Sequence, residues 1–200
     1  MDIFSLRSFN GQRYGLAALA LLVLTASAAH SETLLTERHE DYTISGRSAA
    51  ELRGQLGRLG PRDAEDGKIY DANTRSELSL RSTYRSSLDS CRIASIEIKL
   101  DIVYVMPRWA DYGSGTRDAR DFWDRYIAKL TIHEQGHRDV GMQLAADLER
   151  DLLELRGRYC EDVGKAADEI SRRAFKTLKD RNREYDVRTR HGLEQGTVFP

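Results

Sequence analysis

The chain has 200 residues, of which 40% are hydrophobic and 32% are charged, and this suits one domain of ordinary size rather than two. Its 31 Lys and Arg residues nearly balance its 32 Asp and Glu residues, so the formal net charge is −1. This balance argues against a protein that binds nucleic acid through bulk positive charge, because such a domain is strongly basic.

The N-terminus has the pattern of a secretory signal peptide. Two arginines precede an apolar run at residues 16–24, and Ala26-Ser27-Ala28 follows it. The run is shorter than the roughly 20 apolar residues that a membrane-spanning helix needs, whereas small residues after such a run are typical of a cleavage site. We therefore expect residues 1–28 to be a signal peptide, residues 29–200 to form a single domain, and the mature protein to be periplasmic or secreted, without a membrane span.

Export changes the expected chemistry of the two cysteines, Cys91 and Cys160. An even number of cysteines in an oxidising compartment favours a disulfide. A bridge between them would close a loop of about 70 residues and would stabilise the fold by roughly 4 kcal/mol in the chain-entropy model. The alternative is a pair of buried free thiols.

The first part of the mature chain predicts a short strand and a short helix. Residues 41–45 are the strand candidate. Ser48 and Glu51 form a capping box, which marks a helix start, and apolar residues follow at helical spacing until Gly60-Pro61 ends the helix.

Two longer segments then predict strands. Residues 78–84 and 91–106 alternate between apolar and polar side chains, which is typical of strands with one buried face. Pro107 is expected to end the second strand. Together with residues 41–45, these segments predict a small antiparallel sheet.

From about Arg117 the apolar period changes from 2 to 3.6. It predicts a helix of about forty residues, a turn between Gly157 and Gly164, and a second helix from near Lys165 to Tyr185. The predicted order is β-α-β-β-β-α-α, and the predicted fold class is α+β, with the sheet packed on a long helical hairpin.

The first long helix carries the sequence His133-Glu-Gln-Gly-His137. Residues i and i+4 share one face of a helix, so both imidazoles can reach the same ion. Neutral imidazoles suit Zn²⁺, and Glu134 would be placed as the general base in a metal-assisted hydrolysis. The pattern therefore predicts a zinc site, for which the alternative is two ordinary polar residues on an apolar helix face.

A catalytic zinc site needs a third protein ligand. The helical hairpin returns the C-terminal tail to the level of the histidine pair, so His191 is the first candidate for the third ligand and Asp186 is the second. If Asp186 is not a ligand, its carboxylate could orient one of the imidazoles. His39 has no geometric reason to reach the site. Tyr185 or Thr189 could donate a hydrogen bond to a developing oxyanion, or could serve only packing and turn formation.

At these residues the sequence resembles a bacterial family, the domain of unknown function 922, whose members are described as predicted secreted zinc-dependent proteases. The resemblance covers about residues 40–196. The matching elements are Tyr42-x-Ile44-x-Gly46, Gly60-Pro61, Pro107-Arg-Trp109, His133-Glu-x-Gly-His137 and Tyr185-Asp-x-x-Thr-x-His-Gly192. The resemblance implies a zinc-binding exported protein and supports the metal site more than any particular substrate.

Three functions are compatible with these features. The first is a periplasmic or secreted zinc metallopeptidase that acts on a protein or peptide substrate. The second is a non-enzymatic zinc-binding envelope or adhesion factor, and the third is a zinc amidase that acts on cell-wall peptide. A non-ligand carboxylate at Glu134 favours an enzyme, because a storage site has no use for one beside the metal.

The signal-peptide pattern predicts a mature N-terminus between Ala29 and Glu32. N-terminal sequencing of the exported protein tests this, and a sequence that begins at Met1 would contradict it.

Overall fold

A computed structural model describes residues 30–64 and 66–199, so the expected signal peptide lies outside the described residues. The fold is α+β, as predicted. In chain order its elements are β1 (His30–Ile44), α1 (Ala49–Leu59), β2 (Asn73–Ser86), β3 (Cys91–Trp109), the 3₁₀ turn η1 (Tyr112–Ser114), α2 (Arg117–Leu153), β4 (Arg156–Gly157), α3 (Cys160–Thr189) and the 3₁₀ turn η2 (Leu193–Gln195). Within the described residues, no helix has the length and apolar character required to cross a membrane.

The sheet is mixed, with the order β1-β3-β2 and the short β4 paired to the start of β3. β2 and β3 are antiparallel because residues 87–90 connect them directly. β1 instead runs parallel to β3, because α1 and β2 intervene before the chain returns beside it. The expectation of a wholly antiparallel sheet is therefore wrong for β1. The predicted order also changes, since β4 follows α2 and only two long strands follow α1.

Two strand boundaries differ from the expected ones. β1 is 15 residues long rather than five, because pairing with β3 continues along residues 30–40, most of which are exposed. β3 does not end at Pro107 but continues to Trp109. Beyond Val105 it pairs with β1 alone, and a missing N–H group is tolerated at such an edge.

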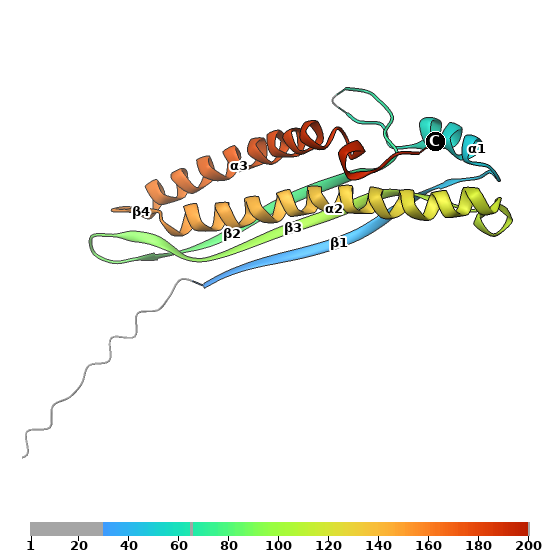
Figure 1. Ribbon diagram of the computed structural model, residues 1–200. Coiled ribbons are helices and arrows are strands. Elements are labelled where there is room, and N and C mark those ends of the chain that lie inside the picture. Colours follow the sequence, from blue (N-terminus) through green and yellow to red (C-terminus); the bar gives the residue numbers. More distant parts are fainter. Residues whose placement is uncertain (1–29, 65, 200) are drawn as a thin grey trace, which may run out of the picture.

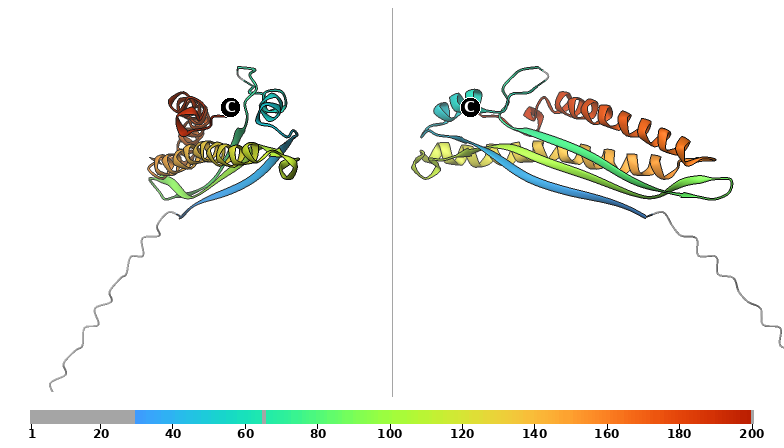
Figure 2. Two further views of the ribbon diagram at one scale, coloured as in Figure 1. Left: turned by 45° about the vertical axis from the view of Figure 1, so that its right-hand side comes forward. Right: turned by 180° about the vertical axis from the view of Figure 1, so that it is seen from behind.

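Both long helices lie on the same side of the sheet (Figures 1 and 2). α2 crosses the sheet close to β3, as an ideal Cβ at Gly141 would lie 3.1 Å from a methyl carbon of Leu100. α3 packs beside α2 as its antiparallel partner. The core between these layers includes buried side chains of β3 and α2, namely Ile96, Ile98, Leu100, Ile102, Trp123, Tyr126, Leu130, Leu144, Leu148 and Leu152.

The predicted disulfide between Cys91 and Cys160 is present. It joins the first residue of β3 to the first residue of α3. α3 therefore begins five residues before the expected start at Lys165, and the turn that was expected to contain Cys160 ends before it. The bridge fixes the far end of the helical hairpin to the sheet.

Removal of this bridge should destabilise the fold substantially. Because it closes a loop with a sequence separation of 69 residues, the double variant Cys91→Ala/Cys160→Ala is expected to lose roughly 4 kcal/mol of unfolding free energy. Urea unfolding followed by circular dichroism measures the loss. Wild-type protein treated with reductant should behave like the variant, and unchanged stability in both would contradict a stabilising role for the bridge.

Candidate metal centre

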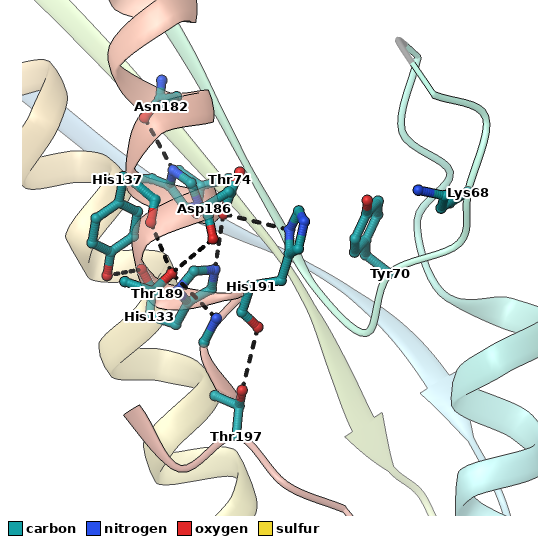
Figure 3. Close-up of polar contacts among 12 residues, drawn as sticks. Lys68, Tyr70, Thr74, His133, His137, Asn182, Asp186, Thr189, His191 and Thr197 are labelled. Carbon is teal, nitrogen blue, oxygen red and sulfur yellow. Dashed lines mark hydrogen bonds and ion pairs between the residues drawn. The ribbon is translucent and has the colours of Figure 1, made fainter. Parts of the chain in front are cut away.

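Three side chains from the two long helices converge at one point (Figure 3). His133 and His137 lie one turn apart on α2 and are almost fully buried. Asp186 reaches them from the last turns of α3. Its Oδ1 atom lies 3.2 Å from Nε2 of His133 and 3.1 Å from Nε2 of His137. A single carboxylate oxygen is therefore shared by both imidazoles.

The other ring nitrogen of each histidine also faces an oxygen. Nδ1 of His133 lies 2.9 Å from Oε1 of Gln195, and Nδ1 of His137 lies 3.0 Å from Oδ1 of Asn182. A neutral imidazole carries one N–H group, so two neutral rings cannot donate to all of these oxygens. If Nδ1 donates to the amide oxygen, each Nε2 presents a lone pair toward Asp186. A cation between these atoms, either protons or a metal ion, balances the arrangement.

Within the described residues, the cluster of potential ligand side chains that could hold a metal ion consists of His133, His137 and Asp186. Their ligand atoms all lie within 4.8 Å of one another. Two imidazole nitrogens and a carboxylate oxygen are a donor set that suits a divalent transition metal. His191 is not in this group: its Nδ1 lies 3.8 Å from Oδ1 of Asp186, and its side chain is 51% exposed. The geometry thus favours Asp186 over His191, the reverse of the order expected from the sequence.

Charge and burial act against each other in this group. Burial alone would raise the pKa of the Asp186 carboxyl, but hydrogen bonds from both imidazoles hold that pKa well below its ordinary value. Burial disfavours the imidazolium form of His137, yet the contact with Asp186 raises its pKa above the ordinary value. The metal-free site therefore favours an ionised carboxylate beside positive charge.

Glu134 occupies a different side of α2 from the two histidines. It is 3% exposed, and its Oε2 accepts a hydrogen bond of 2.7 Å from the hydroxyl of Thr74 on β2. Burial raises the pKa of its carboxyl, although the nearby His137, the bond from Thr74 and the nearby His133 oppose this shift. Glu134 is thus a carboxylate held against the edge strand of the sheet, beside the metal-binding group.

Tyr185 supports His133 instead of facing the cleft. Its ring stacks on the imidazole of His133 at 5.2 Å between centroids, and its hydroxyl donates to the His133 carbonyl at 3.1 Å. The hydroxyl also accepts a hydrogen bond from Nε2 of Gln195 at 3.0 Å. These contacts engage the Tyr185 hydroxyl within the protein, and so they favour the packing alternative over a hydrogen bond to an oxyanion.

The close approach of Tyr185 explains the glycine in the His133 motif. An ideal Cβ at Gly136 would lie 1.9 Å from the hydroxyl oxygen of Tyr185. A side chain at this position cannot coexist with the observed placement of α3 against α2. Gly136 is therefore required by the contact between the two helices.

His191 lies just beyond the C-terminus of α3. Arg190 and His191 both have positive φ, 50° and 51°, and the N–H group of His191 donates to the Asp186 carbonyl at 2.8 Å, so the helix ends in a left-handed turn. The imidazole packs against Tyr70 at 5.0 Å between ring centroids (Figure 3). The hydroxyl of Thr189 donates to the Tyr185 carbonyl, which is a helix-end contact rather than one directed at substrate.

His39, the remaining ligand candidate, lies on β1, and its ring packs on Tyr104. It is not among the residues that line the cleft beside the metal-binding group. Three residues of the site were not predicted from the sequence: Thr74, Asn182 and Gln195. Asn182 and Asp186 are four residues apart on a helix, a spacing that could have identified Asn182. Thr74 and Gln195 have no such signal, because they reach the site from other elements.

The metal-binding group lies in an open cleft of about 790 Å³. The cleft is bounded by α2, α3 and side chains from residues 66–72. Its walls carry both charge signs, and Arg53 and Tyr126 both bind the Asp71 carboxylate in the wall. This volume is sufficient to hold several side chains of an extended ligand.

The fold and the site together define an α+β protein with one disulfide among its described residues and a His-His-Asp group able to hold a metal ion. Residues 39–192 match a family described as "Bacterial protein of unknown function (DUF922)", and the chain belongs to this family. No curated protein and no solved structure shows a significant match to the chain. The family assignment predicted from the motifs is thereby confirmed, while the family itself carries no established activity.

Substitution of Gly136 by Ala should disturb the site. A new methyl group would overlap the Tyr185 hydroxyl, and overpacking of this kind costs about 1–3 kcal/mol. The variant is expected to unfold at lower urea concentration and to bind Zn²⁺ more weakly, since Tyr185 supports His133.

Gly54 on α1 provides the matched control, because an ideal Cβ there meets no atom within 4 Å. Gly54→Ala should stabilise the protein by about 0.5–1 kcal/mol through helix propensity. Equal stability and equal zinc affinity of the two variants would contradict the steric role of Gly136.

Proposed function

We propose that the protein is an exported zinc-dependent hydrolase that cleaves peptide bonds, with His133, His137 and Asp186 as zinc ligands. The convergence of these three side chains in an open cleft, next to the buried Glu134, is the observation that carries this proposal. Two histidines and one carboxylate form a donor set that holds zinc in hydrolases and leaves a coordination position for water. The amide oxygens of Asn182 and Gln195 fix the imidazoles in one orientation.

A bound Zn²⁺ would polarise a substrate carbonyl and acidify a water molecule. In this proposal Glu134 accepts the proton of the attacking water and later delivers it to the leaving amine. Burial favours this role, because it moves the pKa of the Glu134 carboxyl upward toward the range in which proton transfer is efficient near neutral pH. Thr74 orients the carboxylate through its hydroxyl group.

Three features support export to the periplasm or the medium. They are the apolar run at residues 16–24, the Ala26-Ser27-Ala28 sequence after it, and the disulfide between Cys91 and Cys160. The disulfide is the strongest of them, because the cytosol keeps most thiols reduced. The substrate would then be an extracellular or cell-envelope peptide.

The two alternative functions differ from this one in substrate or in turnover. A zinc amidase would use the same residues on cell-wall peptide, and a zinc-binding envelope factor would bind the ion without turnover. Hydrolysis assays on casein and on peptidoglycan, with and without a chelator, separate the three. Chelator-sensitive cleavage of casein supports the peptidase, and release of peptides from peptidoglycan alone supports the amidase. Tight zinc binding without cleavage of either substrate supports the non-enzymatic factor.

The substitution Glu134→Gln should separate zinc binding from hydrolysis. Glutamine is nearly isosteric and can still accept the hydrogen bond from Thr74, but it cannot accept a proton. Turnover is expected to fall by about 10²–10⁴-fold or more with little change in zinc affinity, as measured by peptide hydrolysis and by competition with a zinc chelator. Retained hydrolysis would exclude Glu134 as the general base.

The third ligand is tested by a pair of substitutions. Loss of a residue that merely orients a metal ligand typically weakens metal binding by roughly 10–100-fold. Asp186→Ala should weaken zinc binding by more than this, because it removes a ligand itself. His191→Ala should cost less, since that imidazole lies outside the ligand group. Asp180→Ala is the matched control on the exposed surface of α3. Loss of zinc in His191→Ala with retention in Asp186→Ala would assign the third ligand to His191.

A further inference from the structure

The C-terminal tail lies in the same cleft as the metal-binding group. After η2, residues 197–199 line the cleft together with His133 and Glu134. The ring of Phe199 packs edge-on against Tyr126 at 4.7 Å and against Phe122 at 5.5 Å between centroids. Phe199 thus covers an aromatic cluster on the N-terminal half of α2.

The cluster is formed by three side chains of α2, which are Phe122, Trp123 and Tyr126. Trp123 and Tyr126 are almost fully buried with Phe199 in place, and their rings contact each other at 6.0 Å. Tyr126 lines the cleft, whereas Phe122 and Trp123 do not. Removal of the Phe199 ring would expose toward the cleft the faces of all three rings that it contacts. Such faces select flat or bulky apolar groups.

The tail is held at the cluster by the ring of Phe199 rather than by its backbone. The last backbone hydrogen bond in this segment is donated by the Thr197 N–H group to the Gly192 carbonyl at 3.1 Å. Among the described residues, neither Val198 nor Phe199 has a hydrogen-bond partner, and Val198 is 56% exposed. A competing side chain at the cluster would have to replace the Phe199 ring contacts. The segment also lies beyond Gly192, where the match to the family ends.

The position of the cluster relative to His133 sets the register of a bound peptide. Tyr126 and His133 are seven residues apart on α2, which corresponds to roughly 10 Å along the helix axis. An extended peptide rises about 3.3 Å per residue. A side chain in the cluster would therefore belong to a residue about three positions from the bond that is cleaved.

We propose that the cluster of Phe122, Trp123 and Tyr126 is a substrate subsite for an aromatic side chain, and that Phe199 covers it until a peptide substrate displaces the tail. This inference rests on the proposed peptidase function and adds to it a substrate class, peptides with an aromatic residue near the cleaved bond. The tail acts as an intramolecular competitor. It lowers the apparent affinity for such peptides by the fraction of time that the subsite is open.

The test measures peptide binding to the zinc-loaded protein without turnover, in the Glu134→Gln background. The probes are fluorescein-labelled heptapeptides of alanine and serine that carry Phe or Glu at one position in turn, or no substitution. Fluorescence anisotropy gives the Kd. The additional substitution Phe199→Ala should lower the Kd of Phe peptides by about tenfold, as expected when an internal competitor that closes about nine-tenths of the sites is removed. The Kd of the other peptides should not change.

Phe175→Ala is the matched control, because Phe175 lies exposed on α3 and is not among the cleft residues. Phe199→Leu, which retains apolar bulk, should give a smaller gain and remains informative if Phe199→Ala folds poorly. If the Kd depends neither on a Phe residue in the peptide nor on the substitutions at Phe199, the proposed subsite is overturned. The proposed peptidase function is not affected by that result. If the zinc-loaded protein binds none of the peptides and the wild-type protein does not cleave casein, the peptidase function itself is overturned.

Discussion

The shared oxygen of Asp186 is the contact on which the arrangement of the site depends. Two imidazole nitrogens point at it, and both remaining ring nitrogens point at amide oxygens of Asn182 and Gln195. With the amide oxygens placed as they are, positive charge between the rings and the carboxylate would satisfy all of these acceptors together. The group links α2, α3 and Gln195 of η2 through these contacts, and a cation bound there would couple the stability of this end of the molecule to metal or proton binding.

The hairpin of α2 and α3 is fixed at both ends. At the far end the bridge between Cys91 and Cys160 attaches the start of α3 to β3. At the near end Tyr185 stacks on His133, and the absence of a side chain at Gly136 lets the two helices approach closely. With both ends held, α3 cannot slide along α2, and the register that places Asp186 opposite the histidine pair is maintained. A covalent link remote from the site thus contributes to its geometry.

The helical geometry of α2 directs the histidine pair and Glu134 to different sides of the helix. Successive residues on a helix differ by about 100°, so His133 faces Asp186 on α3, while Glu134 faces Thr74 on the edge strand β2. The sheet therefore holds the carboxylate, and α3 holds the histidines. This division explains why a site with a five-residue sequence signature needs three separate elements of the fold to orient it.

The sequence by itself determined the features that have a local pattern: the spacing of the histidine pair, the long helices, the alternating strands and the cysteine count. Only the tertiary structure decided that Asp186 rather than His191 contacts the pair, and that β1 runs parallel to β3. The placement of Asp186 follows from the start of α3 at Cys160 instead of Lys165 and from its continuation to Thr189. That start lacks the strongest local signal, because Tyr159 at the N-cap makes no side-chain capping bond. Contacts between elements depend on their relative register, and periodicity within one element cannot encode it.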